Sequence, residues 1–191
     1  MACAILDGLV SSGLTTFVPD CKPKYSFSIT ARRQEHALKL SERYPNAYIT
    51  IDNNDENLWR FHDDDQPLSH LVLICTKPDS TYEVCRSIVL AHDTAPAQFV
   101  LPTVITMCPG ITISTLESWL SLRNIQGRFA VIRTMPNTPV SLRQGTTALI
   151  ASPYTTAVQV DQVVDVFHVF SPCVEILPEE KLLNVAAAIS G

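Results

Sequence analysis

Hydrophobic and polar positions follow two different periods along the chain, and the two periods alternate. Residues 24–30 (KYSFSIT) place Tyr25, Phe27 and Ile29 on one side, which is the two-residue period of a strand. Residues 32–45 consist of helix-favouring residues and end at a proline. Short apolar runs predict further strands at residues 47–51, 70–75, 102–110, 128–134, 146–152 and 173–177. Further helices are predicted at residues 1–12, 80–92, 112–123, 155–170 and 179–189, the second of them starting at Ser80 or Thr81.

This alternation is typical of an α/β fold, in which a doubly wound, mostly parallel sheet is covered by helices on both faces. A Rossmann-type domain begins with a strand and a glycine-rich turn before its first helix. This sequence opens on the helix, and only Gly8 and Gly13 occur before residue 100. We therefore expect a Rossmann-type sheet whose first strand is missing.

Polar loops follow four of the predicted strands. Their sequences are TARR (30–33), CTKP (75–78), MCPG (107–110) and TMPNTP (134–139). In doubly wound sheets, ligands bind outside the carboxyl ends of the strands, where such loops meet. The four loops therefore predict the walls of one ligand cleft.

Composition and charge argue against several classes of partner. The formal net charge is −5 and no basic run occurs, which argues against a nucleic-acid-binding surface. No apolar run reaches the ~18 residues that a transmembrane helix needs, so no membrane span is predicted. The six cysteines are scattered, which favours buried free thiols in a cytoplasmic protein over disulfides or a zinc site.

Two other polar features are interpreted without a metal. The acidic run at residues 63–65 is taken as a solvated loop, because no glycine turn and glutamate follow it to make a calcium loop. His168 falls within the apolar face of the predicted helix 155–170, which favours packing over catalysis. No metal site is therefore predicted.

The loop residues themselves suggest a nucleotide cofactor. Arg32 and Arg33 end a strand that would be the second of a dinucleotide-binding fold, and no acidic residue stands there to hold a ribose hydroxyl. Arginine suits a 2′-phosphate, so NADPH is favoured over NADH, although a solvated helix start explains the two residues equally well. Lys77 places a cation in a turn stiffened by Pro78, or is an ordinary loop lysine.

Five segments resemble pyrroline-5-carboxylate reductases, and together they extend along essentially the whole chain. The most specific is RTMPNTPVSLRQGTTAL (133–149), which is very close to the family's R-x-M-P-N-T-P signature. TMCPGITISTLESWL (106–120) is similar to another family segment, with Pro109 in place of the usual alanine. The remaining three segments are MACAILDGLVSSG (1–13), CTKP (75–78) and PEEKLLNVAAAISG (178–191).

The resemblance implies a function and a set of site residues. The family reduces the cyclic imine pyrroline-5-carboxylate to proline with NAD(P)H. By position, Asn137 would lie near the nicotinamide and Glu180 near the substrate, so both are predicted catalytic residues. Ser190 and Gly191 would begin the turn that binds the substrate carboxylate. With Arg33 added from its charge, the predicted cofactor-binding residues are Ala31, Arg32, Arg33, Asn53, Cys75, Thr76, Lys77, Pro78, Met107, Cys108 and Pro109.

The resemblance also implies a domain division. Residues 1–177 would be an incomplete NAD(P)-binding domain, and residues 178–191 the truncated start of the C-terminal region that binds substrate and makes the family's homo-oligomer. Two functions remain open. One is an NADPH-dependent reductase of a small cyclic imine carboxylate, either pyrroline-5-carboxylate or, in secondary metabolism, piperideine-6-carboxylate, which gives pipecolate. The other is an inactive truncated remnant or a partner-completed domain of the family.

Overall fold

The computed structural model describes residues 2–12, 26–59, 70–93, 101–123 and 127–190. The predicted acidic loop at residues 63–65 lies outside these ranges. The elements in chain order are α1 Ala2–Ser11, β1 Ser28–Thr30, α2 Gln34–Arg43, β2 Tyr48–Thr50, η1 Glu56–Trp59, β3 Leu71–Ile74, α3 Pro78–His92, β4 Thr103–Thr106, α4 Ile113–Trp119, β5 Val131–Pro136, η2 Thr138–Leu142, β6 Thr146–Ala151, α5 Ala157–His168, β7 Cys173–Ile176 and α6 Glu180–Ser190.

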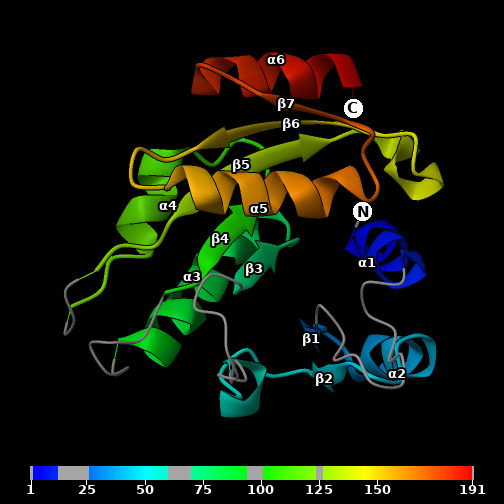
Figure 1. Cartoon of the computed structure of the whole chain (residues 1–191). Helices are drawn as coiled ribbons and strands as arrows, with labels where there is room; N and C mark the ends of the chain where they lie inside the picture. The colour runs from blue at the N-terminus through cyan, green and yellow to red at the C-terminus, as the bar shows by residue number, and fades with distance from the viewer. Residues whose placement is uncertain (1, 13–25, 60–69, 94–100, 124–126, 191) are drawn as a thin grey trace.

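The strands form two sheets (Figure 1). The larger sheet has the order β3-β4-β5-β6-β7, and all its neighbours are parallel except β5 and β6. The connection from β5 to β6 contains only residues 137–145, which is short for a crossover, so the two strands run antiparallel. The smaller sheet pairs β1 with β2 in parallel, and among the described residues no strand joins it to β3. The predicted mostly parallel Rossmann-type α/β fold is confirmed.

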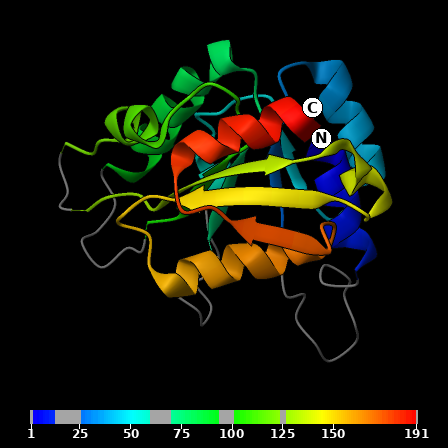
Figure 2. The ribbon, with the colours of Figure 1, turned by 90° about the horizontal axis from the view of Figure 1, so that it is seen from above.

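The larger sheet buries apolar residues on both faces, because successive side chains of a strand point to opposite sides. On β6, Leu149 packs into a core with α5 and α1, whereas Ala148 and Ile150 pack against Leu183 of α6. Figure 2 shows α5 and α6 on opposite sides of the strands. The residues Ile74, Cys85, Ile88, Val104, Leu116 and Val131 form a further core that involves α3 and α4.

Helix α1 is held to α2 by a polar contact as well as to the sheet by packing. Its Asp7 carboxylate accepts hydrogen bonds from Arg43 Nε at 3.0 Å and from the Tyr44 hydroxyl at 2.8 Å. On the other side of the helix, Ile5 and Leu9 enter the core that contains Phe167 and Phe170. This arrangement places α1 beside the larger sheet without a described strand before it.

Several local predictions were wrong. Helix α3 begins at Pro78 rather than at Ser80 or Thr81, because a proline in the first turn gives up no needed hydrogen bond. Strand β5 extends to Pro136, since its last residues pair with β6. His168 is exposed and does not pack in the apolar face of α5. The five described cysteines are free, but Cys3, Cys75 and Cys173 are exposed rather than buried.

Candidate functional site

A pocket opens at the carboxyl ends of β3, β4 and β5, where the fold class predicts ligand binding. Its volume is about 170 Å³, and its lining residues are Cys75, Thr76, Met107, Met135 and Pro136. Cys75, Thr76 and Met107 belong to the predicted cofactor-binding set, so the structure brings loops from separate strands together. Among the described residues, the lining contains no carboxylate, imidazole or amine. The described lining therefore supplies contacts for a weakly polar group.

Hydrogen bonds join the loop after β3 to the loop after β4, and both loops contribute residues to the pocket. The Thr81 hydroxyl lies 3.1 Å from Thr76 Oγ1 and 3.2 Å from Cys108 Sγ. The Cys108 thiol donates to the Thr76 carbonyl at 3.4 Å, and the Cys108 amide donates to Thr106 Oγ1 at 3.1 Å. Cys108 is 2% exposed, so this predicted cofactor residue lies beneath the surface and fixes the shape of the loop.

The remaining residues of these loops are on the surface. Pro109 and Gly110 form an exposed turn, and Gly110 has φ of 77°, a conformation that glycine adopts without strain. Lys77 is exposed at the N-terminus of α3 and its carbonyl accepts from the Ser80 amide at 3.0 Å. Pro78 follows it as the first residue of the helix.

Four predicted cofactor residues follow the strands of the smaller sheet and are not among the described lining residues of the pocket. Ala31 is buried, and its amide donates to the Thr50 carbonyl at 3.0 Å. Arg32 and Arg33 follow directly, are exposed, and have no ion-pair partner among the described residues. The Asn53 carbonyl accepts from the Trp59 indole at 2.8 Å. These residues follow the carboxyl ends of β1 and β2, which is the edge expected for cofactor contacts.

Asn137 closes the loop between β5 and β6. Its side-chain Oδ1 accepts from the Thr146 amide at 2.9 Å, and its own amide donates to the Thr146 carbonyl at 3.1 Å. Its carbonyl accepts from the Val140 amide at 3.3 Å. Asn137 therefore organises the loop whose neighbour, Pro136, lines the pocket.

A second feature of that loop requires a glycine. A Cβ atom on Gly145 would lie 2.4 Å from Val140 Cγ2 and 2.9 Å from Val140 Cα. Arg143, between them, has φ of 55°, the left-handed conformation. The loop is thus folded back on itself so closely that only glycine fits at position 145.

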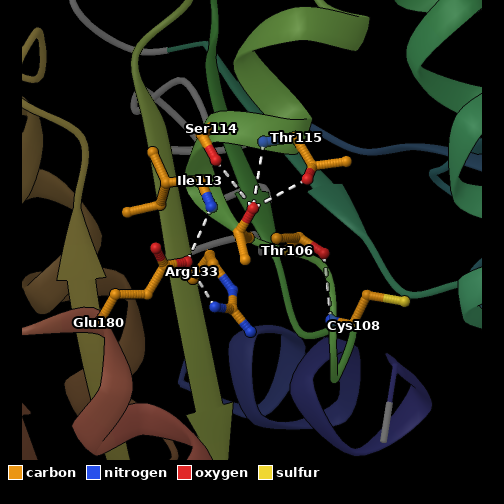
Figure 3. Close-up of polar contacts among 8 residues, drawn as sticks. Thr106, Cys108, Ile113, Ser114, Thr115, Arg133 and Glu180 are labelled. Atoms are coloured by element: carbon orange, nitrogen blue, oxygen red, sulfur yellow. Dashed lines mark hydrogen bonds and ion pairs between the residues drawn. The ribbon is translucent and has the colours of Figure 1, made fainter.

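Sequence reasoning missed Arg133, the first residue of the signature. Arg133 is 2% exposed in the middle of β5, and its Nη1 donates to Glu180 Oε1 at 2.5 Å (Figure 3). The same Glu180 oxygen accepts from the Ile113 amide at 2.7 Å. The available signal was a cation inside an apolar strand, since a buried charge needs a partner. The resemblance implies that Glu180 lies near the substrate. In the structure its carboxylate accepts hydrogen bonds from Arg133 and from the Ile113 amide.

The first residue of helix α4, Ile113, is bonded to the carboxylate of this ion pair. The Thr112 hydroxyl accepts from the Thr115 amide at 3.2 Å. Glu180 accepts from the Ile113 amide (Figure 3). Both bonds satisfy backbone donors that the first turn of a helix leaves without a partner. The Glu180 carboxylate therefore connects the first turn of α6 to the start of α4, which follows the turn after β4.

The two predicted substrate-binding residues, Ser190 and Gly191, are at the C-terminal end of the sequence. Ser190 ends α6, but its side chain is not described, and Gly191 lies outside the described residues. Within the described ranges no group of three or more His, Cys, Asp or Glu side chains could hold a metal ion. In the same ranges no helix has both the length and the apolarity to cross a membrane.

Comparison with known proteins supports the resemblance. No family model matches the chain. The chain is 39% identical, over its full length, to Delta-1-pyrroline-5-carboxylate reductase apf3 of Gibberella fujikuroi and covers 61% of that protein. The whole chain superposes on a pyrroline-5-carboxylate reductase from Coxiella burnetii with a TM-score of 0.72 at 23% identity, covering 60% of that structure.

A further superposition involves a cofactor complex. The chain matches the Plasmodium falciparum pyrroline carboxylate reductase with NADP bound at a TM-score of 0.69 and 19% identity, over 99% of this chain and 58% of that one. The resemblance of the sequence to pyrroline-5-carboxylate reductases is thereby confirmed. This chain is a homologue of proteins with that name and spans about three fifths of their length.

Proposed function

We propose that this chain takes part in the NADPH-dependent reduction of a cyclic imine carboxylate, pyrroline-5-carboxylate to proline or piperideine-6-carboxylate to pipecolate. The observation that most supports this is the pocket at the carboxyl ends of β3, β4 and β5, lined by Cys75, Thr76, Met107, Met135 and Pro136. Its size and apolar lining suit a flat ring held against the backbone. The name of the 39% identical relative supports the five-membered substrate over the six-membered one.

Bound NADPH would supply the hydride that reduces the carbon of the C=N bond, while the ring nitrogen gains a proton and becomes an amine. The chain's own contribution is binding and orientation, because correct placement alone removes a large part of such a barrier. The pocket walls would hold the nicotinamide face, and Asn137 would fix the loop beside it. The described lining residues include no acid, so the proton would come from the substrate iminium or from outside these residues.

Arg32 and Arg33 fit the phosphate of this cofactor. They follow β1 directly, are exposed, and have no ion-pair partner among the described residues. A guanidinium in this state can form charge-assisted hydrogen bonds to a 2′-phosphate without first breaking an internal bond. Lys77, exposed at the start of α3, adds a third cation for the anionic cofactor.

A second candidate function is a cofactor-binding domain that does not itself reduce an imine. The described pocket lining has no acidic or basic side chain, and this favours the second candidate. In this case a partner would supply the remaining substrate contacts. The two candidates predict the same cofactor binding and differ only in turnover.

Both candidates are tested with the 191-residue chain. Titration with NADPH and NADH, followed by cofactor fluorescence, is expected to show tighter binding of NADPH. The double variant Arg32→Ala/Arg33→Ala should weaken NADPH binding at least ~10-fold and leave NADH unchanged, since it removes charge-assisted bonds to one phosphate. Arg86→Ala, at an exposed arginine paired with Glu83, is the control. Equal loss for both cofactors would contradict the assignment.

Turnover then separates the candidates. Consumption of NADPH is measured with each imine and without imine. Oxidation that depends on pyrroline-5-carboxylate supports the reductase, and oxidation that depends only on piperideine-6-carboxylate changes the assigned ring size. NADPH binding without oxidation by either imine supports the cofactor-binding domain.

A further inference from the structure

Among the described residues, Arg133 is the most deeply buried charged side chain, and the proposed function does not use it. It is 2% exposed, and its Nε and Nη2 have no hydrogen-bond partner among the described residues. Its one bond goes from Nη1 to Glu180, whose side chain is 30% exposed. The two residues come from β5 and from the first turn of α6, which are 47 positions apart in the sequence. The charge therefore depends on a single carboxylate from another element.

The Glu180 carboxylate also bonds helix α4. Its Oε1 accepts from the Ile113 amide, the first amide of that helix. The turn before α4 contains Pro109 and the left-handed Gly110, which follow the pocket residue Met107. A carboxylate with one exposed face can leave both partners by rotating into solvent, unless a nearby cation holds it in place.

We propose that Arg133 is a positioning residue that acts through Glu180: it holds the carboxylate on the Ile113 amide and so fixes the turn after β4 and the start of α6 in one arrangement. The inference deepens the proposed function and rests on it, because the sequence predicts that Pro109 of the turn contacts the cofactor and that Glu180 of the helix lies near the substrate. Its test does not require activity. If the chain does not reduce the imine but hydrogen exchange at the Ile113 amide changes as expected, only the proposed function is contradicted.

The readout is hydrogen exchange at the Ile113 amide, measured by NMR in the 191-residue chain. Arg133→Met removes the charge but leaves Glu180 and Ile113 unchanged, and it should accelerate exchange at Ile113 at least ~10-fold. The Leu116 amide, bonded to the Thr112 carbonyl at 3.0 Å, is the internal reference and should change much less. Arg86→Met, which removes an exposed arginine from a pair at 3.7 Å, is the matched control and should leave Ile113 unchanged.

A charge-retaining variant separates positioning from packing. Because only one nitrogen of Arg133 bonds Glu180, a lysine ammonium can replace it, so Arg133→Lys should keep Ile113 protected within ~3-fold. If Arg133→Met does not fold, Arg133→Gln is the neutral variant and should lose the protection that Arg133→Lys retains. Wild-type exchange at Ile113 in the neutral variant, or equal loss in Arg133→Lys and the neutral variant, overturns the proposal.

Discussion

The guanidinium of Arg133 and the carboxylate of Glu180 form an ion pair at 2.5 Å in which the cation is 2% exposed and the anion 30%. This difference in exposure determines how much stability is lost when one residue of the pair is mutated. Removing the anion leaves a cation inside the sheet with no counter-charge, and a buried charge stripped of its partner is strongly destabilising. An exposed pair of the same length carries no such penalty.

Glu180→Ala is therefore expected to lower the free energy of unfolding by ~3–5 kcal/mol. The neighbouring Glu179→Ala is the matched control, because Glu179 pairs with Lys181 at 2.5 Å with both side chains more than half exposed. That variant should change stability by less than ~1 kcal/mol. Urea unfolding followed by circular dichroism measures both. Equal losses in the two variants would show that the pair with Arg133 contributes nothing special.

The second prediction concerns the loop between β5 and β6. Gly145→Ala places a methyl group 2.4 Å from Val140 Cγ2 and 2.9 Å from its Cα, and the Cα belongs to the backbone, so the loop has to move. We expect a loss of ~1–3 kcal/mol, as for other overpacked sites. Gln144→Ala, at the exposed neighbouring position, is the control and should stay within ~0.5 kcal/mol. Thermal unfolding of both variants is the measurement, and an unchanged midpoint for Gly145→Ala would contradict the close approach.

The sequence predicted the order of helices and strands well because their periods are local properties. The start of α3 was misplaced because Thr81, a good capping residue in isolation, is buried and bonded to the Cys108 thiol. Arg133 was missed for a related reason. Its partner Glu180 lies 47 positions away, and no local pattern announces a contact at that distance. The tasks of Asn137 and Cys108 within their loops also became visible only with the neighbouring strands in place.

A third prediction concerns acid stability. His92 is 1% exposed, its ring contacts Trp59 and Phe129 edge to face, and burial lowers its pKa from 6.5. The unfolded chain therefore binds a proton at His92 more readily than the folded one. The stability held by neutral His92 is present above a pH of about 6.5 and is lost as the pH falls through that value toward the lower folded pKa.

The variant that tests this removes the titration but keeps a ring. His92→Phe should reduce the loss of thermal stability between a pH of about 7.5 and a pH of about 5. His36→Phe, at an exposed histidine of α2, is the control and should leave that loss unchanged. The unfolding midpoint is compared at the two pH values for all three proteins. The same pH dependence in His92→Phe and the wild type would remove His92 as its source.

The last prediction separates two tasks of Asn137. As a loop residue, Asn137 supplies the acceptor for the Thr146 amide at 2.9 Å, and as a catalytic residue it would face the nicotinamide. Asn137→Ala removes both the acceptor and the amide group, whereas Asn137→Asp keeps an oxygen in the same place. If the loop task dominates, the Thr146 amide exchanges at least ~10-fold faster in Asn137→Ala and at nearly the wild-type rate in Asn137→Asp.

Turnover, where the wild type shows it, should follow the same order. We expect the rate of imine reduction to fall at least ~10-fold in Asn137→Ala, about 1.4 kcal/mol, because the displaced loop carries the pocket residue Pro136 with it. Asn137→Asp should stay within ~3-fold, since the loop keeps its closing bond. Ser141→Ala, at an exposed hydroxyl of the same loop that bonds the Thr138 carbonyl, is the control and should be unaffected. If Asn137→Asp keeps the Thr146 amide protected but loses turnover as fully as Asn137→Ala, the amide group itself is required and the residue acts on the cofactor directly.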